Sequence, residues 1–203
     1  MIRPLLVAAS TLAITPLAHA ETRALSGFDA VSASGKLQVE ISQGAAHSVR
    51  LDGPRASEVI SRVRDGRLEL ETPRTWFGLS NSRTHVRITM PSVRALSASA
   101  GAEMEARDMR ADALALDSSS GAELTVTGTC GALSADASSG ADLDARGLRC
   151  STANVDSSSG ADAYVQATEL ANVDASSGSD IYLTGGARIG GMDVSSGADV
   201  HRR

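Results

Sequence analysis

The chain has 203 residues, a formal net charge of −5 and only five aromatic residues. Lys36 is its single lysine, and residues 111–203 hold 13 acidic residues against 5 basic ones. This balance excludes a nucleic-acid backbone as the partner and makes anionic lipid unattractive, since both need clustered Lys and Arg. The scarcity of aromatic rings excludes a large conventional core and favours a narrow one of Ala, Val, Leu and Ser.

Residues 1–20 predict a secretory signal peptide. Arg3 supplies a basic start, Leu5–Leu17 is largely apolar, and Ala18–Ala20 has the small-x-small pattern that precedes a cleavage site. We expect cleavage after Ala20, and an uncleaved anchor is the alternative. No Cys follows the apolar run, so lipoprotein processing is not expected, and no later stretch predicts a membrane span. We therefore expect a soluble mature chain in the periplasm or at the cell surface of a bacterium.

Residues 21–94 predict an N-terminal antiparallel β-section. Polar and apolar residues alternate in three runs, as they do in half-buried strands: Lys36–Ile41, Arg67–Glu71 and His85–Met90. Ser57–Arg64 fits a helical turn, and a strand nearly as well. Pro91 ends the section.

Two large apolar residues, Trp76 and Phe77, stand in the loop Pro73–Thr84, which is rich in Pro, Gly, Ser and Asn. The loop could cap the open end of a solenoid, since such folds require capping. The alternative is that Trp76 and Phe77 contact a partner.

A repeat of roughly 19 residues around Ser-Ser-Gly-Ala-Asp occupies residues 95–203. Its glycines are Gly101, Gly121, Gly140, Gly160, Gly178 and Gly197. A fixed period near 20 predicts a solenoid, in which each repeat is one turn that stacks on its neighbours.

Small or apolar residues alternate with acidic ones on both sides of each glycine. The acidic residues that follow the glycines are Glu103, Glu123, Asp142, Asp162, Asp180 and Asp199. The apolar residues five positions before the glycines are Leu116, Ala135, Val155, Val173 and Met192, and each precedes an aspartate: Asp117, Asp136, Asp156, Asp174 and Asp193. This alternation predicts two short strands per turn, with small residues inward and acidic residues outward. The chain is thus predicted to be all-β, with the N-terminal section leading into a narrow parallel β-helix of five to six turns as one continuous domain.

The order of these features resembles a known family. An N-terminal β-section that ends in Val86–Pro91, with the pattern Val-x-Ile-x-x-Pro, is followed by recurring Ser-Gly-x-Asp/Glu turns. This is similar to the DUF2807 family, described as a putative auto-transporter adhesin "head GIN" domain. The resemblance covers roughly residues 25–200 and implies a β-helical exported bacterial protein, and it brings no catalytic residues. The chain departs from the family in its Ala content and its Cys pair.

Cys130 and Cys150 occupy nearly the same place in successive turns. Stacking should bring them about one strand spacing apart, close to the Cα separations of disulfides. In an exported chain we expect them to be oxidised, with a pair of free thiols as the alternative.

The acidic ladders need compensation, because like charges about 5 Å apart repel by roughly 1 kcal/mol even in water. Corner hydroxyls and glycine N–H groups could bond the carboxylates, which is the favoured interpretation. Some carboxylates could instead be protonated, or Ca²⁺ could bridge them. The weak metal candidates are Asp142, Asp156, Asp162, Asp174 and Asp180. No other cofactor is indicated, and the Gly-Gly-x-Gly-x-Asp spacing of calcium-binding β-rolls is missing.

No catalytic constellation is apparent. Ser-Ser-Gly is not the Gly-x-Ser-x-Gly elbow of hydrolases, and His47, His85 and His201 have no distinctive spacing to a nucleophile. A glycan lyase or hydrolase is the enzymatic alternative, but its two carboxylates must differ in environment, whereas repetition makes these alike.

Tyr164 and Tyr182 each lie four residues after a repeat glycine and should stack outward on adjacent turns. They could contact a ligand, although a structural cross-strand pair is the commoner arrangement. We therefore expect a non-enzymatic, adhesin-like binding or structural module. Its partner would be a glycan or protein of the envelope or surface, and edge-to-edge self-association is a further expectation.

Overall fold

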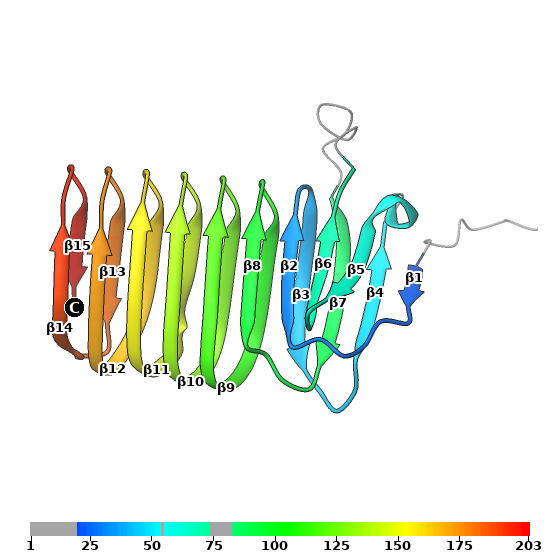
Figure 1. Cartoon of the computed structure of the whole chain (residues 1–203), viewed down its shortest axis with the longest axis horizontal. Coiled ribbons are helices and arrows are strands. Elements are labelled where there is room, and N and C mark those ends of the chain that lie inside the picture. The colour runs from blue at the N-terminus through cyan, green and yellow to red at the C-terminus, as the bar shows by residue number, and fades with distance from the viewer. Residues whose placement is uncertain (1–19, 54, 74–82) are drawn as a thin grey trace, which may run out of the picture.

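The chain folds as a β-solenoid whose narrow coils stack side by side along one axis (Figure 1). The structure is a computed structural model, and it describes residues 20–53, 55–73 and 83–203. The strands are β1 (Ala20–Arg23), β2 (Ala30–Ser34), β3 (Leu37–Gln43), β4 (Ser48–Asp52), β5 (Ile60–Arg64), β6 (Arg67–Glu71), β7 (Thr84–Met90), β8 (Ala95–Ser99), β9 (Glu103–Ser119), β10 (Glu123–Ser138), β11 (Asp142–Ser158), β12 (Asp162–Ala175), β13 (Asp180–Thr184), β14 (Arg188–Val194) and β15 (Asp199–Arg202). A short 3-10 helix, η1 (Ala56–Glu58), precedes β5.

The coils form two faces that lie back to back. Strands β9 to β12 are long because each bends and contributes one half to each face. Face A contains, in spatial order, β7, β3, the first halves of β9 to β12, β13 and β15. Face B contains β6, β2, β8, the second halves of β9 to β12, and β14. All of these pairings are parallel, so the predicted parallel β-helix is confirmed.

Each Ser-Gly corner is a tight turn with two consecutive left-handed residues. At one corner φ is 56° at Ser139 and 65° at Gly140, and the N–H of Ala141 donates to the carbonyl of Ser138 at 3.3 Å. Only glycine adopts such a φ without steric cost, which is why a glycine stands at each of these corners. The N–H of Gly140 also donates to the carbonyl of Ser159 on the next coil at 3.1 Å, so neighbouring corners are held in register.

The core lies between the faces and is built from the inward positions that the repeat predicted. On β11, for example, Leu143 and Ala145 are fully buried, while Asp142 is exposed. The apolar series before the corners behaves in the same way, with one exception. Its first four members are at most 4 % exposed, whereas Met192 is 49 % exposed because it lies on the last coil of the stack.

The N-terminal section mixes antiparallel and parallel pairing. β1 pairs with β4, β4 with β7 and β5 with β6 in the predicted antiparallel sense. β2 and β3, however, form a coil of the solenoid, inserted in parallel between β6 and β7 on one side and β8 and β9 on the other. Alternation identifies a strand but not its direction, so this insertion could not be read from the sequence. Residues 57–64, which fitted a helical turn or a strand, contain the end of η1 and then β5.

Candidate functional site

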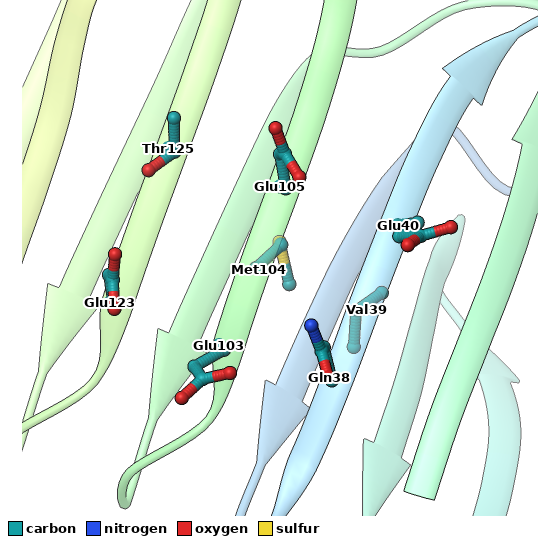
Figure 2. A pocket seen from close by; sticks show the side chains of 8 residues that line it. All are labelled: Gln38, Val39, Glu40, Glu103, Met104, Glu105, Glu123 and Thr125. Carbon is teal, nitrogen blue, oxygen red and sulfur yellow. The ribbon is translucent and has the colours of Figure 1, made fainter.

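A shallow depression of about 240 Å³ lies on Face A, where β3, β9 and β10 run side by side (Figure 2). Its floor is apolar, because Val39 and Met104 point inward and are buried. Strand register sets two outward rows of side chains around this floor. One row holds Gln38, Glu103 and Glu123, and the next holds Glu40, Glu105 and Thr125.

Three of the four carboxylates at the depression have an arginine partner. The ion pairs are Glu103 with Arg83 at 2.9 Å, Glu105 with Arg107 at 2.6 Å, and Glu40 with Arg87 at 3.4 Å. Among the described residues Glu123 has no ion pair. Exposed pairs of this kind contribute only about 0–1 kcal/mol each, so they compete weakly with a ligand for the carboxylates.

The depression is suited to hydrogen bonding with a polar ligand. Carboxylates accept hydrogen bonds, while the Gln38 amide and the Thr125 hydroxyl both donate and accept. Glu103 and Glu105 are half-buried and Glu40 and Glu123 are exposed, so all four carboxylates reach solvent, whereas acid–base catalysis needs two groups in contrasting surroundings. The sequence places Gln38 and Glu103 on outward positions of separate strands. It carried no signal that the inserted β3 brings them together.

A stacked aromatic column lies further along Face A, on β12, β13 and β15. The rings of Tyr164 and Tyr182 are 4.5 Å apart with planes 9° from parallel, which confirms the predicted stacking. His201 extends the column, 4.6 Å from Tyr182 with planes 17° apart. The guanidinium of Arg146 covers the Tyr164 ring at 4.5 Å. Its hydrogen bond to Asp144 holds the pKa of that carboxyl below its ordinary value.

Because the rings of this column cover one another's faces, their edges and phenolic O–H groups are left for a partner. Such a column offers hydrogen-bonding groups rather than an open platform for a sugar ring. The sequence identified the two tyrosines but missed His201 and Arg146. His201 occupies the same position after its glycine as the tyrosines do, which is the signal that could have found it.

The acidic residues form one column on each face beside the corners. On Face A, desolvation raises the pKa of Asp162, and the charges of Asp180 and Asp142 add to it. On Face B, desolvation likewise raises the pKa of Asp136, helped by its two aspartate neighbours in the column. Like charges at successive strand positions disfavour the ionised form of each group.

These columns do not form a metal centre in the part of the chain that the structure describes. No group of three His, Cys, Asp or Glu side chains there is arranged to hold a metal ion. The weak calcium candidates are Asp142, Asp156, Asp162, Asp174 and Asp180, and they lie spread over both faces.

The buried corner serines Ser118, Ser157 and Ser179 donate their hydroxyl groups to backbone carbonyls and not to the acidic columns. The buried hydroxyl of Ser157 donates to the carbonyl of Ala161 at 3.0 Å, and that of Ser179 donates to the carbonyl of Ser157 at 2.8 Å. Ser97, which lies before a corner, donates to Asp117 at 3.1 Å. The expectation that corner hydroxyls and glycine N–H groups bond the carboxylates is therefore wrong for the described corners. These groups pair with carbonyls, which the buried backbone requires.

Cys130 and Cys150 form the predicted disulfide between β10 and β11, with their Cα atoms 4.5 Å apart. Trp76 and Phe77 lie outside the described residues, so their role as a cap or a partner contact stays a prediction.

The three histidines considered as bases occupy separate places. His47 donates a hydrogen bond from Nε2 to the carbonyl of Phe28 at 2.7 Å, and its ring packs against that of Phe28. His85 lies on β7, and His201 ends the aromatic column. Among the described residues no hydrogen bond joins any of the three to a serine hydroxyl.

Comparison with known protein families shows which family this chain belongs to. The DUF2807 family, described as "Putative auto-transporter adhesin, head GIN domain", matches residues 27–187. The chain belongs to the DUF2807 family. The match spans both the N-terminal section and most of the repeat of this DUF2807 protein, and it confirms the resemblance seen in the sequence. A comparison with the curated proteins finds no match.

Solved structures share the fold of this DUF2807 protein at low sequence identity. A structure named a putative adhesin from Bacteroides fragilis has a TM-score of 0.69 at 14 % identity, and covers 93 % of this chain and 97 % of its own. A putative adhesin from Parabacteroides distasonis has a TM-score of 0.56 at 13 % identity, with 91 % and 96 % covered. A putative lipid binding protein from the same organism has a TM-score of 0.51 at 15 % identity, with 91 % and 96 % covered.

Within the described ranges, no helix has the length and apolar character needed to cross a membrane.

Proposed function

We propose that this DUF2807 protein is an exported, non-enzymatic binding module of the bacterial envelope that holds an extended glycan along Face A. The observation that carries the proposal is the regularity of that face. Its outward side chains form straight columns of carboxylate and phenol groups, and an open depression lies at β3, β9 and β10. Such a surface matches a polymer of repeating hydroxyl groups, each of which can donate to a carboxylate.

The family description supports binding over catalysis, because both the family and several neighbours of the same fold are named as adhesins. One neighbour is named for lipid binding. In this chain one continuous cluster of buried side chains occupies the space between the two faces.

Export follows from the predicted signal peptide and agrees with the disulfide, since disulfides persist in oxidising compartments. We propose cleavage after Ala20, which leaves Glu21–Arg23 of β1 to pair with β4. The mass of the protein recovered from a periplasmic or surface fraction tests this step. A chain that retains residues 1–20 would contradict it.

Glycan binding is tested with the purified protein on a glycan array. We expect Asp162→Ala and Tyr182→Ala on Face A to reduce binding, and Asp156→Ala to leave it unchanged, because Asp156 is an exposed aspartate on Face B. Release of reducing ends during incubation would identify an enzyme instead. Absence of binding to every glycan, or equal losses from both faces, would overturn the proposal.

A further inference from the structure

The last coil of the solenoid leaves two parallel strands with a partner on one side only. β14 pairs with β12, and β15 pairs with β13. In the part of the chain that the structure describes, the outer edges of both strands carry unpaired backbone groups. Such an edge is a template for another strand, and solenoids normally cover it with a capping element.

Two apolar side chains of β14 are exposed where their counterparts on the preceding coil are buried. Met192 and Val194 of β14 are 49 % and 41 % exposed. The matching residues on β12, Val173 and Ala175, are 4 % and 0 % exposed. Met192 and Val194 thus hold inward core positions, and one further layer of strands would bury them as the earlier coils are buried.

The opposite end of the stack is closed differently. There β5 and β4 pair antiparallel onto β6 and β7, and β1 covers β4. Arg62 of β5 bonds Glu69 at 2.6 Å and Glu71 at 3.0 Å. Arginines on a short edge strand oppose further pairing, so this end does not offer a matching surface for head-to-tail growth.

The charges along β14 and β15 favour a second copy of this chain as the partner. β14 begins with exposed Arg188 and carries exposed Asp193 near its end, whereas β15 begins with exposed Asp199 and ends in His201 and Arg202. Each strand therefore has charges of opposite sign at its two ends. Pairing with a copy that runs antiparallel places unlike charges opposite each other on both faces, whereas parallel pairing would place like charges together.

We propose that the β14–β15 edge is an interface at which two copies of this chain join tail to tail in antiparallel fashion. A two-fold axis perpendicular to the faces reverses both strands at once, so Face A continues into Face A of the partner and Face B into Face B. The contact is isologous, and the outer edges of β14 and β15 both pair with the second copy, so the dimer is closed. The dimer also doubles the length of Face A.

The first test is the mass of the purified protein, measured by analytical ultracentrifugation over a range of concentrations. We expect a dimer that dissociates on dilution. Met192→Lys and Val194→Lys should give a monomer, because a charge at an inward edge position blocks pairing. Ile60→Lys on β5 is the matched control: Ile60 is 44 % exposed on the other end of the stack, and its change should leave the dimer intact. Circular dichroism and thermal melting confirm that each variant is folded, which is expected because the replaced side chains are already exposed.

The second test addresses orientation. Arg188→Asp and Asp193→Arg, made singly, should each weaken association by about tenfold, since each change places like charges opposite at two symmetric positions. The double reversal should restore it. A monomer at all concentrations, dissociation by Ile60→Lys, open-ended fibres, or a double reversal no better than the single ones would each overturn the proposal.

Discussion

Cys130 and Cys150 lie directly opposite each other on adjacent coils, and their disulfide joins β10 to β11 at the centre of the stack. The bond closes a loop with a sequence separation of 20 residues, which is one turn of the solenoid. Strand pairing and the narrow core between the faces also hold each turn to the next. The disulfide thus fixes the register of two neighbouring coils covalently.

Removal of the disulfide should lower the free energy of unfolding. For Cys130→Ala with Cys150→Ala we expect a loss of about 3 kcal/mol, because the unfolded chain regains the entropy of an open loop of this length. Urea unfolding measures the loss. Dithiothreitol should shift the wild type by the same amount and leave the double variant unchanged. A reduced wild type with an unchanged midpoint would contradict the stabilising role.

The corner serines should be more sensitive to substitution than their neighbours. Ser139 has a φ of 56°, a conformation that a β-branched side chain opposes. Ser139→Val should therefore lower stability by about 1–2 kcal/mol in urea unfolding. Ser138→Val is the control, because Ser138 ends β10 in a pleated position that accepts valine. Equal losses at the two positions would show that the corner geometry is not the cause.

The acidic column on Face B should make stability depend on pH through Asp136, whose ordinary pKa of 3.8 is raised by desolvation and by the charges of Asp156 and Asp117. A carboxyl with a higher pKa in the native state binds its proton more tightly when folded. Its contribution to stability is complete below the unfolded pKa and is lost as the pH rises through the native pKa.

Asp136→Asn removes this loss, so we expect a higher melting temperature than wild type at neutral pH. The gain should be below about 1 kcal/mol because solvent screens the column. It should shrink as the pH falls toward 3.8, where the wild-type carboxyl is itself protonated. Asp112→Asn is the control, since Asp112 is exposed and lies outside both columns. A gain that does not depend on pH would exclude this explanation.

The repeat predicted most of the solenoid because each coil copies the last. Once a glycine is assigned to a corner, the inward direction of Ala141, the outward direction of Asp142 and the pairing of Cys130 with Cys150 all follow from counting residues. The stacking of Tyr164 on Tyr182 follows in the same way. These regularities repeat in every coil, so they can be recognised from one sequence.

The depression on Face A could not be predicted, because it depends on where β3 sits. Gln38 and Glu40 meet Glu103 and Glu105 only because β2 and β3 insert between coils that come later in the sequence. Alternation in Lys36–Ile41 is equally compatible with antiparallel pairing. The hydrogen-bond partners of the corner hydroxyls could not be predicted either. Backbone carbonyls compete with carboxylates for each serine hydroxyl, and only the folded geometry decides between them.

The aromatic column should stabilise the last coils measurably. Tyr182 stacks on both Tyr164 and His201, and each aromatic pair contributes about 0.5–1.5 kcal/mol beyond its buried area. Tyr182→Ala should therefore lower the free energy of unfolding by about 1–3 kcal/mol. Tyr182→Phe keeps the ring and should retain most of this stability.

A double-mutant cycle isolates the contact from the loss of side-chain area. Tyr164→Ala combined with Tyr182→Ala should show a coupling of about 1 kcal/mol. Tyr182→Ala combined with Asp136→Asn should be additive within about 0.5 kcal/mol, because these residues lie on opposite faces and share no partner. A Tyr164–Tyr182 coupling no larger than that of the distant pair would mean that the two rings are neighbours without mutual stabilisation. Tyr182 would then contribute to stability only through the area that its ring covers.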